Sequence, residues 1–238
     1  MKIVNRIVTA LIAAATFPFL ITQLFFRIII SIDEDSVAYS IITAFAGKDN
    51  ILTGNRLGIQ ESLWSIYKMF ADGSESSMDF DFMKLWNSLP EELDKSKIMI
   101  IASLACVALG VLIAVVIIGC AFFTRAYKTI IALGGAGFAS FLSAIVLFGQ
   151  AGKPLQDGSV DALRLIAQLL MGENTSGIGS IIAGFLEGTL SVDSFSLGGA
   201  VFGAMIMMIG VMVWEFAYLI TLPENEKPKK KIKKAKKA

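Results

Sequence analysis

The sequence predicts an all-α integral membrane protein with four transmembrane helices and two external segments that contain short amphipathic helices. The first observation is composition, since 55% of the residues are hydrophobic, only 17% are charged, and the mean hydropathy is +0.69. Soluble domains are more polar than this. The second observation is a pair of uncharged apolar runs at 98–123 and 129–149. Each exceeds the roughly 18 apolar residues that mark a membrane span, so together they predict a transmembrane hairpin, residues 96–149.

Charge segregation along the chain predicts the orientation of these spans. The turn at 124–128 carries Arg125 and Lys128, and the tail from Glu224 has eight lysines against two acids. Segment 33–95 instead has twelve acids against five bases. Short loops rich in Lys and Arg stay on the cytoplasmic side of a membrane. We therefore expect the turn and both termini to be cytoplasmic.

The first span is predicted as one helix over residues 3–32, within an N-terminal unit 1–32. A cleaved signal peptide is the alternative, but its apolar region would be only about 7–15 residues long. Pro18 predicts a kink in the middle of this span. Arg27 lies near its outer end, where a snorkelling side chain is one interpretation and an anion or substrate contact in a hydrophilic groove is the other.

The external acidic segment 33–95 is predicted to hold three short helices. They cover 37–46, 57–71 and a stretch that begins at Asp79. Their apolar faces can pack together as a cap, lie on the membrane surface, or form a lid that docks a partner. Pro90 is followed by two acidic residues, a pattern typical of a helix start, so the second span is expected to begin outside the bilayer.

The second external segment covers 150–193. It is predicted to contain a helix that begins at Asp157 or Ser159 and ends at Gly172. The following stretch, 177–190, is too short to span a membrane and is rich in glycine. It is expected to lie on the membrane surface, with a re-entrant pore loop as the alternative.

The fourth span is predicted over 194–222, with Trp214 and Tyr218 as an interfacial belt. Glu215 is the only acidic residue in any predicted span. An acid at this depth is expected to pair with a cation near the inner face, and a site for a proton or a coupling ion is the alternative. The candidate cations are Arg6, Arg125 and Lys128.

Small residues recur at every fourth position in the spans. Such residues let helix backbones approach closely in lipid, so they predict helix contacts within one bundle or between subunits. The predicted packing positions are Ala102, Cys106, Gly110, Ala114, Ala132, Ala136, Ser140, Ala144, Gly199 and Gly203.

No catalytic constellation is apparent in the sequence. Histidine is absent, and Cys106 and Cys120 lie about 21 Å apart if one helix holds both. Neither a phosphate-binding loop nor a nucleophile elbow is present, and the glycine-rich LGGAG at 133–137 has no lysine after it. We expect a protein that is not an enzyme and that has no cofactor or metal.

The basic tail, 223–238, is predicted to be disordered in water and to bind anionic lipid at the inner membrane face. Nucleic acid or the ribosome is the alternative polyanion. The lysines expected to make this contact are Lys229, Lys230, Lys231, Lys233, Lys234, Lys236 and Lys237.

The order of cytoplasmic N-terminus, long outer loop, tight inner turn, second outer loop and inner tail resembles the four-span layout of claudins, and loosely that of connexin-type channel subunits. The resemblance is one of plan, because those families stabilise their outer loops with cysteines and this chain has none there. Outer segments without cysteine and a lysine-rich tail suit a prokaryotic plasma membrane.

The expected function is that of a non-catalytic subunit of an oligomeric channel, transport or secretion assembly, with copies of itself or other membrane subunits as partners. Two alternatives remain. Arg27 and the basic tail suggest a membrane insertase or chaperone, whereas Glu215 and the glycine-rich stretch suggest a small secondary transporter.

Overall fold

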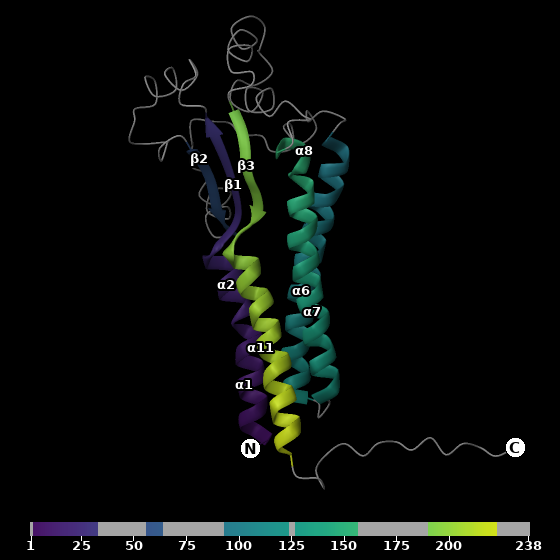
Figure 1. The fold of residues 1–238 in the computed structure, drawn as a ribbon. Helices are drawn as coiled ribbons and strands as arrows, with labels where there is room; N and C mark the ends of the chain where they lie inside the picture. Colours follow the sequence, from purple (N-terminus) through teal and green to yellow (C-terminus); the bar gives the residue numbers. More distant parts are fainter. Residues whose placement is uncertain (1, 33–55, 64–92, 124–126, 157–189, 223–238) are drawn as a thin grey trace, which may run out of the picture.

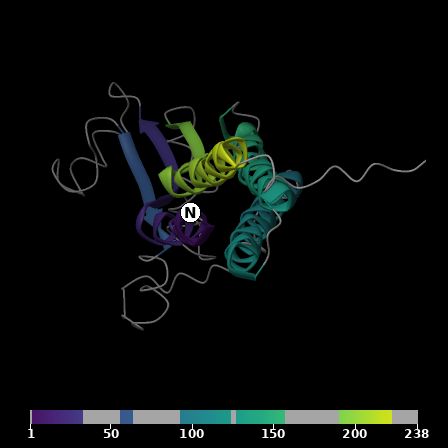
Figure 2. The ribbon, with the colours of Figure 1, turned by 90° about the horizontal axis from the view of Figure 1, so that it is seen from below.

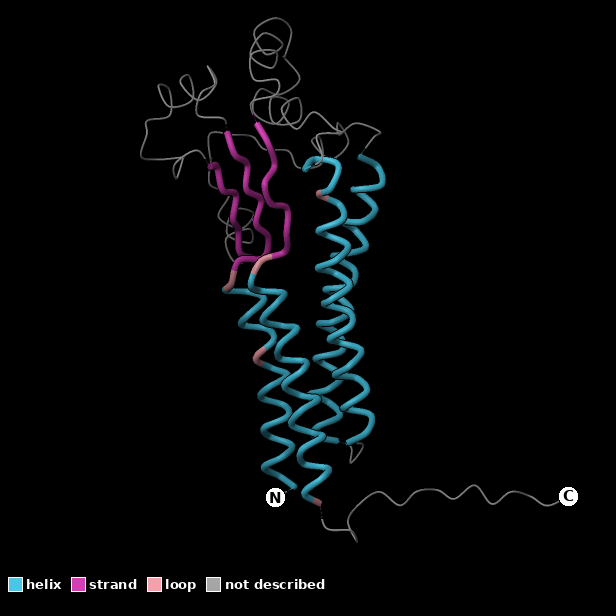
Figure 3. Tube along the Cα trace, viewed as in Figure 1, coloured by secondary structure: helices cyan, strands magenta, loops and turns pink. Residues whose placement is uncertain are grey.

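The computed structural model describes residues 2–32, 56–63, 93–123, 127–156 and 190–222. Within these ranges the chain forms helices and three strands, which Figure 3 colours cyan and magenta. The elements in chain order are α1 (Lys2–Ala14), α2 (Thr16–Thr22), β1 (Leu24–Ile32), β2 (Arg56–Ser62), α6 (Asp94–Phe123), α7 (Tyr127–Ala151), α8 (Lys153–Gln156), β3 (Leu190–Leu197) and α11 (Gly199–Thr221).

Four helical segments are long and apolar enough to cross a membrane, as the sequence predicted. They are Ile3–Thr22, Asp94–Phe122, Tyr127–Gln156 and Gly199–Thr221. Large apolar side chains such as Leu112, Val116 and Phe216 point outward from them and are exposed. A soluble protein rarely exposes apolar surface of this extent, whereas lipid accepts it.

The spans form two antiparallel pairs (Figures 1 and 2). The first pair joins α1 and α2 to α11, and the second is the α6–α7 hairpin. The pairs are held together because α1 packs against α6 and α11 packs against α7. We call the end where α1 begins and α11 finishes the turn end, since α6 ends and α7 begins there too. The opposite end is the sheet end.

Two predicted spans have wrong bounds, because part of each forms a strand of the sheet. The first span does not run as helix to residue 32, because it ends at Thr22 and continues as β1. The fourth does not begin at residue 194, because β3 occupies Leu190–Leu197 and α11 starts at Gly199. β1 reads LFFRIIISI, and aromatic and β-branched residues favour strands. An apolar run of this kind does not separate strand from helix by periodicity, which is why one long helix was expected.

The predicted amphipathic helix 57–71 is wrong in its first part, because Arg56–Ser62 forms β2. β2 and β3 both pair antiparallel with β1, which gives the strand order β2-β1-β3. Central β1 is almost entirely apolar. Pairing with strands that lie far away in the sequence supplies the backbone hydrogen bonds that decide its conformation.

The β1–β3 ladder continues the α2–α11 helix pair beyond the helices (Figure 1). At the junction Gly198 donates a backbone hydrogen bond to the carbonyl of Phe25, at 2.8 Å. A Cβ atom on Gly198 would collide with the backbone carbonyl of Leu24. Glycine is therefore required where the strand pair meets the helix pair.

The first span is interrupted at Ala15, between α1 and α2. Pro18 follows in the first turn of α2, and it has no N–H to donate to the carbonyl of Ala14. In a continuous helix its ring would also clash with this carbonyl. The break therefore falls about one turn before the proline. This agrees with the predicted kink.

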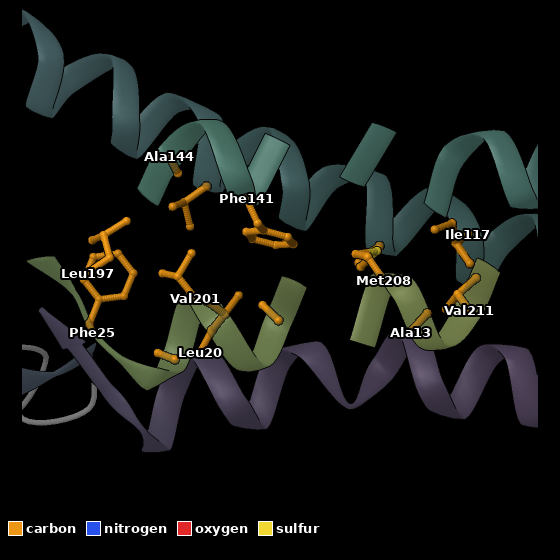
Figure 4. Close-up of a cluster of buried hydrophobic side chains, with 14 of the residues drawn as sticks. Ala13, Leu20, Phe25, Ile117, Phe141, Ala144, Leu197, Val201, Met208 and Val211 are labelled. Atoms are coloured by element: carbon orange, nitrogen blue, oxygen red, sulfur yellow. The ribbon is translucent and has the colours of Figure 1, made fainter. Parts of the chain in front are cut away.

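One apolar core runs along the whole bundle and up to the sheet (Figure 4). In the bundle, Phe141 and Met208 fill the space between the two helix pairs, and both are fully buried. At the sheet end the ring of Phe195 on β3 stacks on Phe148 of α7, with ring centroids 4.7 Å apart. The same ring lies against Gly152. The sheet thus packs against α7 at the sheet end of the hairpin.

Several predictions fall outside the described residues. They are the helix 37–46, the remainder (64–71) of the helix 57–71, the helix from Asp79 onward, the helix start at Pro90, the helix from Asp157 or Ser159, nearly all of 177–190, Arg125, and the tail. The second and third spans, predicted at 98–123 and 129–149, correspond to α6 and α7, which extend a few residues further.

Candidate functional site

A buried polar cluster lies between α1 and α11, toward the turn end. Glu215 of α11 is 1% exposed, and the two α1 residues that face it, Asn5 and Thr9, are 2% and 0% exposed. Asn5 and Thr9 are four residues apart, so they occupy the same face of α1, one turn apart. Glu215 precedes the last residue of α11 by six positions, which is about 9 Å along the helix axis.

One carboxyl oxygen of Glu215 receives both hydrogen bonds of the cluster. The Asn5 amide Nδ2 donates to Oε1 at 3.1 Å, and the Thr9 hydroxyl donates to the same atom at 2.5 Å. The two α1 residues therefore bind a single oxygen and hold α1 against α11.

Among the described residues, the second oxygen of the carboxyl group has no hydrogen-bond partner. Glu215 Oε2 and Asn5 Oδ1 are both buried acceptor atoms without a donor. A buried polar group without a partner costs about 1–3 kcal/mol, and a buried charge costs considerably more. Two neighbouring residues that each leave an acceptor unsatisfied therefore indicate that something supplies a donor or a positive charge between them.

The predicted ion pair of Glu215 is not found among the described residues. Arg6 and Lys128 form no ion pair with it there, and Arg125 lies outside those residues. Its partners are instead neutral side chains of α1, because Asn5 and Thr9 face α11. Arg6 adjoins Asn5 in the sequence, and its side chain is partly exposed.

Both interpretations of Arg27 assumed that it lies near the end of a helix. It does not. It lies in the middle of β1, opposite Gln60 of β2 and Ser196 of β3, with an exposed side chain. The strand places it beyond the last residue of α2. Neither a snorkelling side chain on a span nor a contact inside a groove of the bundle describes this position.

Two serines of the described helices make further polar contacts between spans. Ser103 donates to the carbonyl of Ala144 at 2.8 Å, and Ser140 donates to the carbonyl of Cys106 at 2.7 Å. Both contacts join α6 to α7. Each hydroxyl is satisfied by a backbone carbonyl, so the hairpin interface contains no comparable unmatched acceptor on these residues.

The predicted packing positions divide into two groups. Gly110 lies against the ring of Phe141, and a Cβ atom there would be 2.6 Å from ring carbon Cζ. Gly203 has the same relation to Phe19, also at 2.6 Å. The other positions turned fully or partly inward are Ala102, Cys106, Ala114, Ser140 and Ala144.

Ala132, Ala136 and Gly199 are exposed, so they make no close packing contact inside this chain. The reason is geometric for α7. A step of four residues turns a helix by about 400°, so a strict four-residue repeat drifts around the helix by about 40° at each step. Ser140 and Ala144 have drifted to the buried face, while Ala132 and Ala136 remain outside.

The predicted interfacial aromatics lie at the turn end. Trp214 is exposed, and Tyr218 is partly buried with its ring 5.5 Å from that of Tyr127. Tyr218 is three residues after Glu215 and therefore lies close to the polar cluster on α11.

Asn5 and Thr9 were not among the site residues predicted from the sequence. Each is a polar residue inside an apolar run, and their four-residue spacing puts them on one helix face. That pattern could have marked them as partners for a buried group. It could not have identified Glu215 as that group, because 210 positions separate it from Asn5.

The described residues contain no group of three or more His, Cys, Asp or Glu side chains placed to hold a metal ion. In comparisons with known proteins, no family model, curated protein or solved structure matched the chain.

Proposed function

We propose that this protein is a non-catalytic subunit of an oligomeric channel, transport or secretion assembly. The observation that supports the proposal is an outward face of α7 made of small residues. Ala132, Ala136, Ala139 and Ser143 are all exposed, at a spacing that keeps them on one side of the helix.

A small-residue face has a physical use in lipid. Lipid chains are as apolar as leucine, so helices gain little by burying large apolar groups against one another. They associate where small residues let backbones come close enough for van der Waals contact. α7 already uses its opposite face, with Gly134 and Gly137, against Met208 and Met212 of α11. The outward face remains for a second subunit.

In the proposed arrangement the protein resides in a plasma membrane, of prokaryotic type, with the turn end at the cytoplasm. Arg125, Lys128 and the lysine tail then share the inner side, where the anionic leaflet attracts them. The sheet end projects outside. Lipid is the proposed partner of the tail, and nucleic acid or ribosome is the competing one.

The size of the assembly tests the proposal. The full chain, purified in nanodiscs, is measured by native mass spectrometry. We expect several copies per particle, and we expect Ala136→Leu combined with Ala139→Leu to reduce the particle to a single copy without lowering helix content. Ala108→Leu is the matched control, since Ala108 is also small and exposed but lies on α6. A wild-type particle with one copy and no other subunit contradicts the proposal.

Orientation is tested by cysteine labelling in a variant that lacks Cys106 and Cys120. Cysteines placed at Ser76 and Ser176 should react with a membrane-impermeant reagent added to intact cells, whereas one placed at Ala235 should react only after lysis. Labelling of the tail from outside reverses the arrangement.

A small transporter is the second candidate, and the buried carboxyl of Glu215 favours it. Acidic residues inside membrane spans are rare and commonly mark proton or ion pathways. The insertase alternative required Arg27 inside a groove open to lipid, and its exposed position in β1 gives that alternative no support.

A further inference from the structure

We propose that Glu215 and Asn5 form a proton-binding site, in which a proton on Glu215 Oε2 completes a paired contact between the carboxyl group of α11 and the amide group of α1. This inference does not depend on the oligomeric assembly proposed above. It rests on the geometry of one buried pair of side chains.

A carboxylic acid and an amide are complementary at both ends. The amide has a donor end, Nδ2, and an acceptor end, Oδ1, while the protonated acid has an acceptor oxygen and an O–H donor. Nδ2 of Asn5 already donates to Oε1 of Glu215. The two atoms that remain, Oδ1 and Oε2, are both buried acceptors without a donor. One proton on Oε2 turns this oxygen into the missing donor and gives Oδ1 a partner.

An ionised Glu215 would leave the cluster with a buried negative charge and with acceptor atoms that have no donor. Its charge would be buried between two apolar helices with neutral partners only, Asn5 and Thr9. Charge in such surroundings is expensive, and a buried acid without an ion pair becomes neutral instead. The neutral form thus removes both the charge and the unmatched acceptor.

A metal cation is less suited to the same place. Hard cations take about six or more oxygen ligands, and the Glu215–Asn5 pair offers two acceptor oxygens without a donor among the described residues. Oε1 is already engaged by two donors. A proton needs no further ligands.

Among the described residues, several other charged or titratable groups lie at this end of the bundle. They are Lys2 and Arg6 on α1, Cys120 on α6, Tyr127 and Lys128 on α7, and Tyr218 on α11. α2 contributes no such group, and Arg27 of β1 and Asp193 of β3 lie at the opposite end. The two hydrogen bonds that Glu215 Oε1 accepts come from the neutral side chains of Asn5 and Thr9.

The site makes the contact between α1 and α11 dependent on pH. The folded protein holds a proton that an unfolded, solvated glutamate releases near neutral pH, so the folded state binds more protons. By linkage, stability then falls as pH rises, and the unfolding constant increases by up to about tenfold per pH unit.

Infrared difference spectroscopy tests the site directly, on the full chain in nanodiscs at pH 7. We expect the C=O band of a protonated carboxylic acid, which disappears in Glu215→Gln and shifts in Asn5→Leu. The control is Asp94→Asn, which removes an exposed carboxyl that pairs with Lys97. This variant should retain the band. A spectrum without a protonated acid at pH 7 overturns the proposal.

Thermal unfolding from pH 5 to pH 9 gives an independent measurement. Gln resembles the protonated acid, because it has one acceptor oxygen and one N–H donor end. Glu215→Gln should therefore keep the wild-type melting temperature at low pH and lose the wild type's decline at high pH. The Asp94→Asn control should decline like the wild type.

Three results would overturn the proton site. One is a wild type whose stability does not change with pH. Another is Glu215→Gln less stable than the wild type at low pH, which would mean that the negative charge itself is needed. The third is stabilisation by Na⁺ over an equal concentration of choline, lost in Glu215→Gln, which would assign the site to a cation.

Discussion

The two helix pairs are built on different principles. The α6–α7 hairpin is formed by neighbouring segments, and its polar contacts are serine hydroxyls that donate to backbone carbonyls. The pair made by α1, α2 and α11 joins the beginning of the chain to residues beyond position 199, and its polar contact is a buried carboxyl with one unmatched oxygen. Both serine hydroxyls of the hairpin have backbone partners within the hairpin. The second pair instead contains a buried titratable group, Glu215.

The two pairs also differ at the sheet end. The strands β1 and β3 extend α2 and α11, so this pair consists of helix in one half and strand in the other (Figure 3). The hairpin remains helical along its length, and α7 supports the sheet through Phe148. A membrane helix satisfies its own backbone, but a strand needs a neighbour. The sheet end is therefore where distant parts of the chain must meet.

The largest expected effects come from filling the closest contacts in each pair. Gly110→Leu and Gly203→Leu place a large side chain where even a Cβ atom would be 2.6 Å from an aromatic ring. We expect each to lower the free energy of unfolding by about 3 kcal/mol or more, since overpacking costs about 1–3 kcal/mol in milder cases. Melting of the purified protein measures this.

Gly119→Leu is the matched control on α6, because nothing lies within 4 Å of a Cβ atom at that position. It should melt like the wild type. If Gly110→Leu and Gly203→Leu also melt like the wild type, the two interfaces are not packed as described.

A somewhat smaller loss is expected for Gly198→Ala, at the junction of strand and helix in the second pair. The added methyl group meets the backbone of Leu24, which cannot move without breaking the β1–β3 ladder. We expect a cost of about 2–3 kcal/mol. Gly149→Ala in the hairpin, where nothing lies within 4 Å, should be neutral or slightly stabilising. Equal effects of the two substitutions would remove the proposed difference between the pairs.

Glu215→Leu tests the polar contact of the second pair. It leaves the Asn5 amide and the Thr9 hydroxyl buried without their acceptor. Each unsatisfied group costs about 1–3 kcal/mol in soluble proteins. The cost is smaller between membrane helices. We expect a net loss of about 2 kcal/mol at pH 6, measured by unfolding. Combining Glu215→Leu with Asn5→Leu and Thr9→Val should recover most of this loss, because the unmatched groups are then gone. If the triple variant does not regain stability, the loss in Glu215→Leu does not come from the unmatched amide and hydroxyl groups.

The smallest effect is expected for Ser140→Ala in the hairpin. This change removes one hydroxyl that donates to a carbonyl, and such contacts between membrane helices average about 0.6 kcal/mol. The loss should not depend on pH, unlike the behaviour of the α1–α11 contact. A pH-dependent loss in Ser140→Ala would show that the hairpin also responds to protonation.

The sequence by itself determined the four spans, because about 20 successive apolar residues have few alternatives in a protein other than a membrane helix. It also determined the interruption near Pro18, since this follows from a local steric rule. Each of these features depends on residues within a few turns of one another. Hydropathy and side-chain size are therefore sufficient to predict them.

Only the tertiary structure decided the strands and the partners of Glu215. The apolar run Leu24–Ile32 is compatible with helix or strand, and it becomes a strand because Arg56–Ser62 and Leu190–Leu197 pair with it from both sides. In the same way, Glu215 accepts hydrogen bonds from residues 206 and 210 positions away and does not pair with the cations near the predicted membrane face. Hydrogen bonds between distant segments depend on which surfaces come into contact in the folded protein, and no local sequence pattern predicts those contacts.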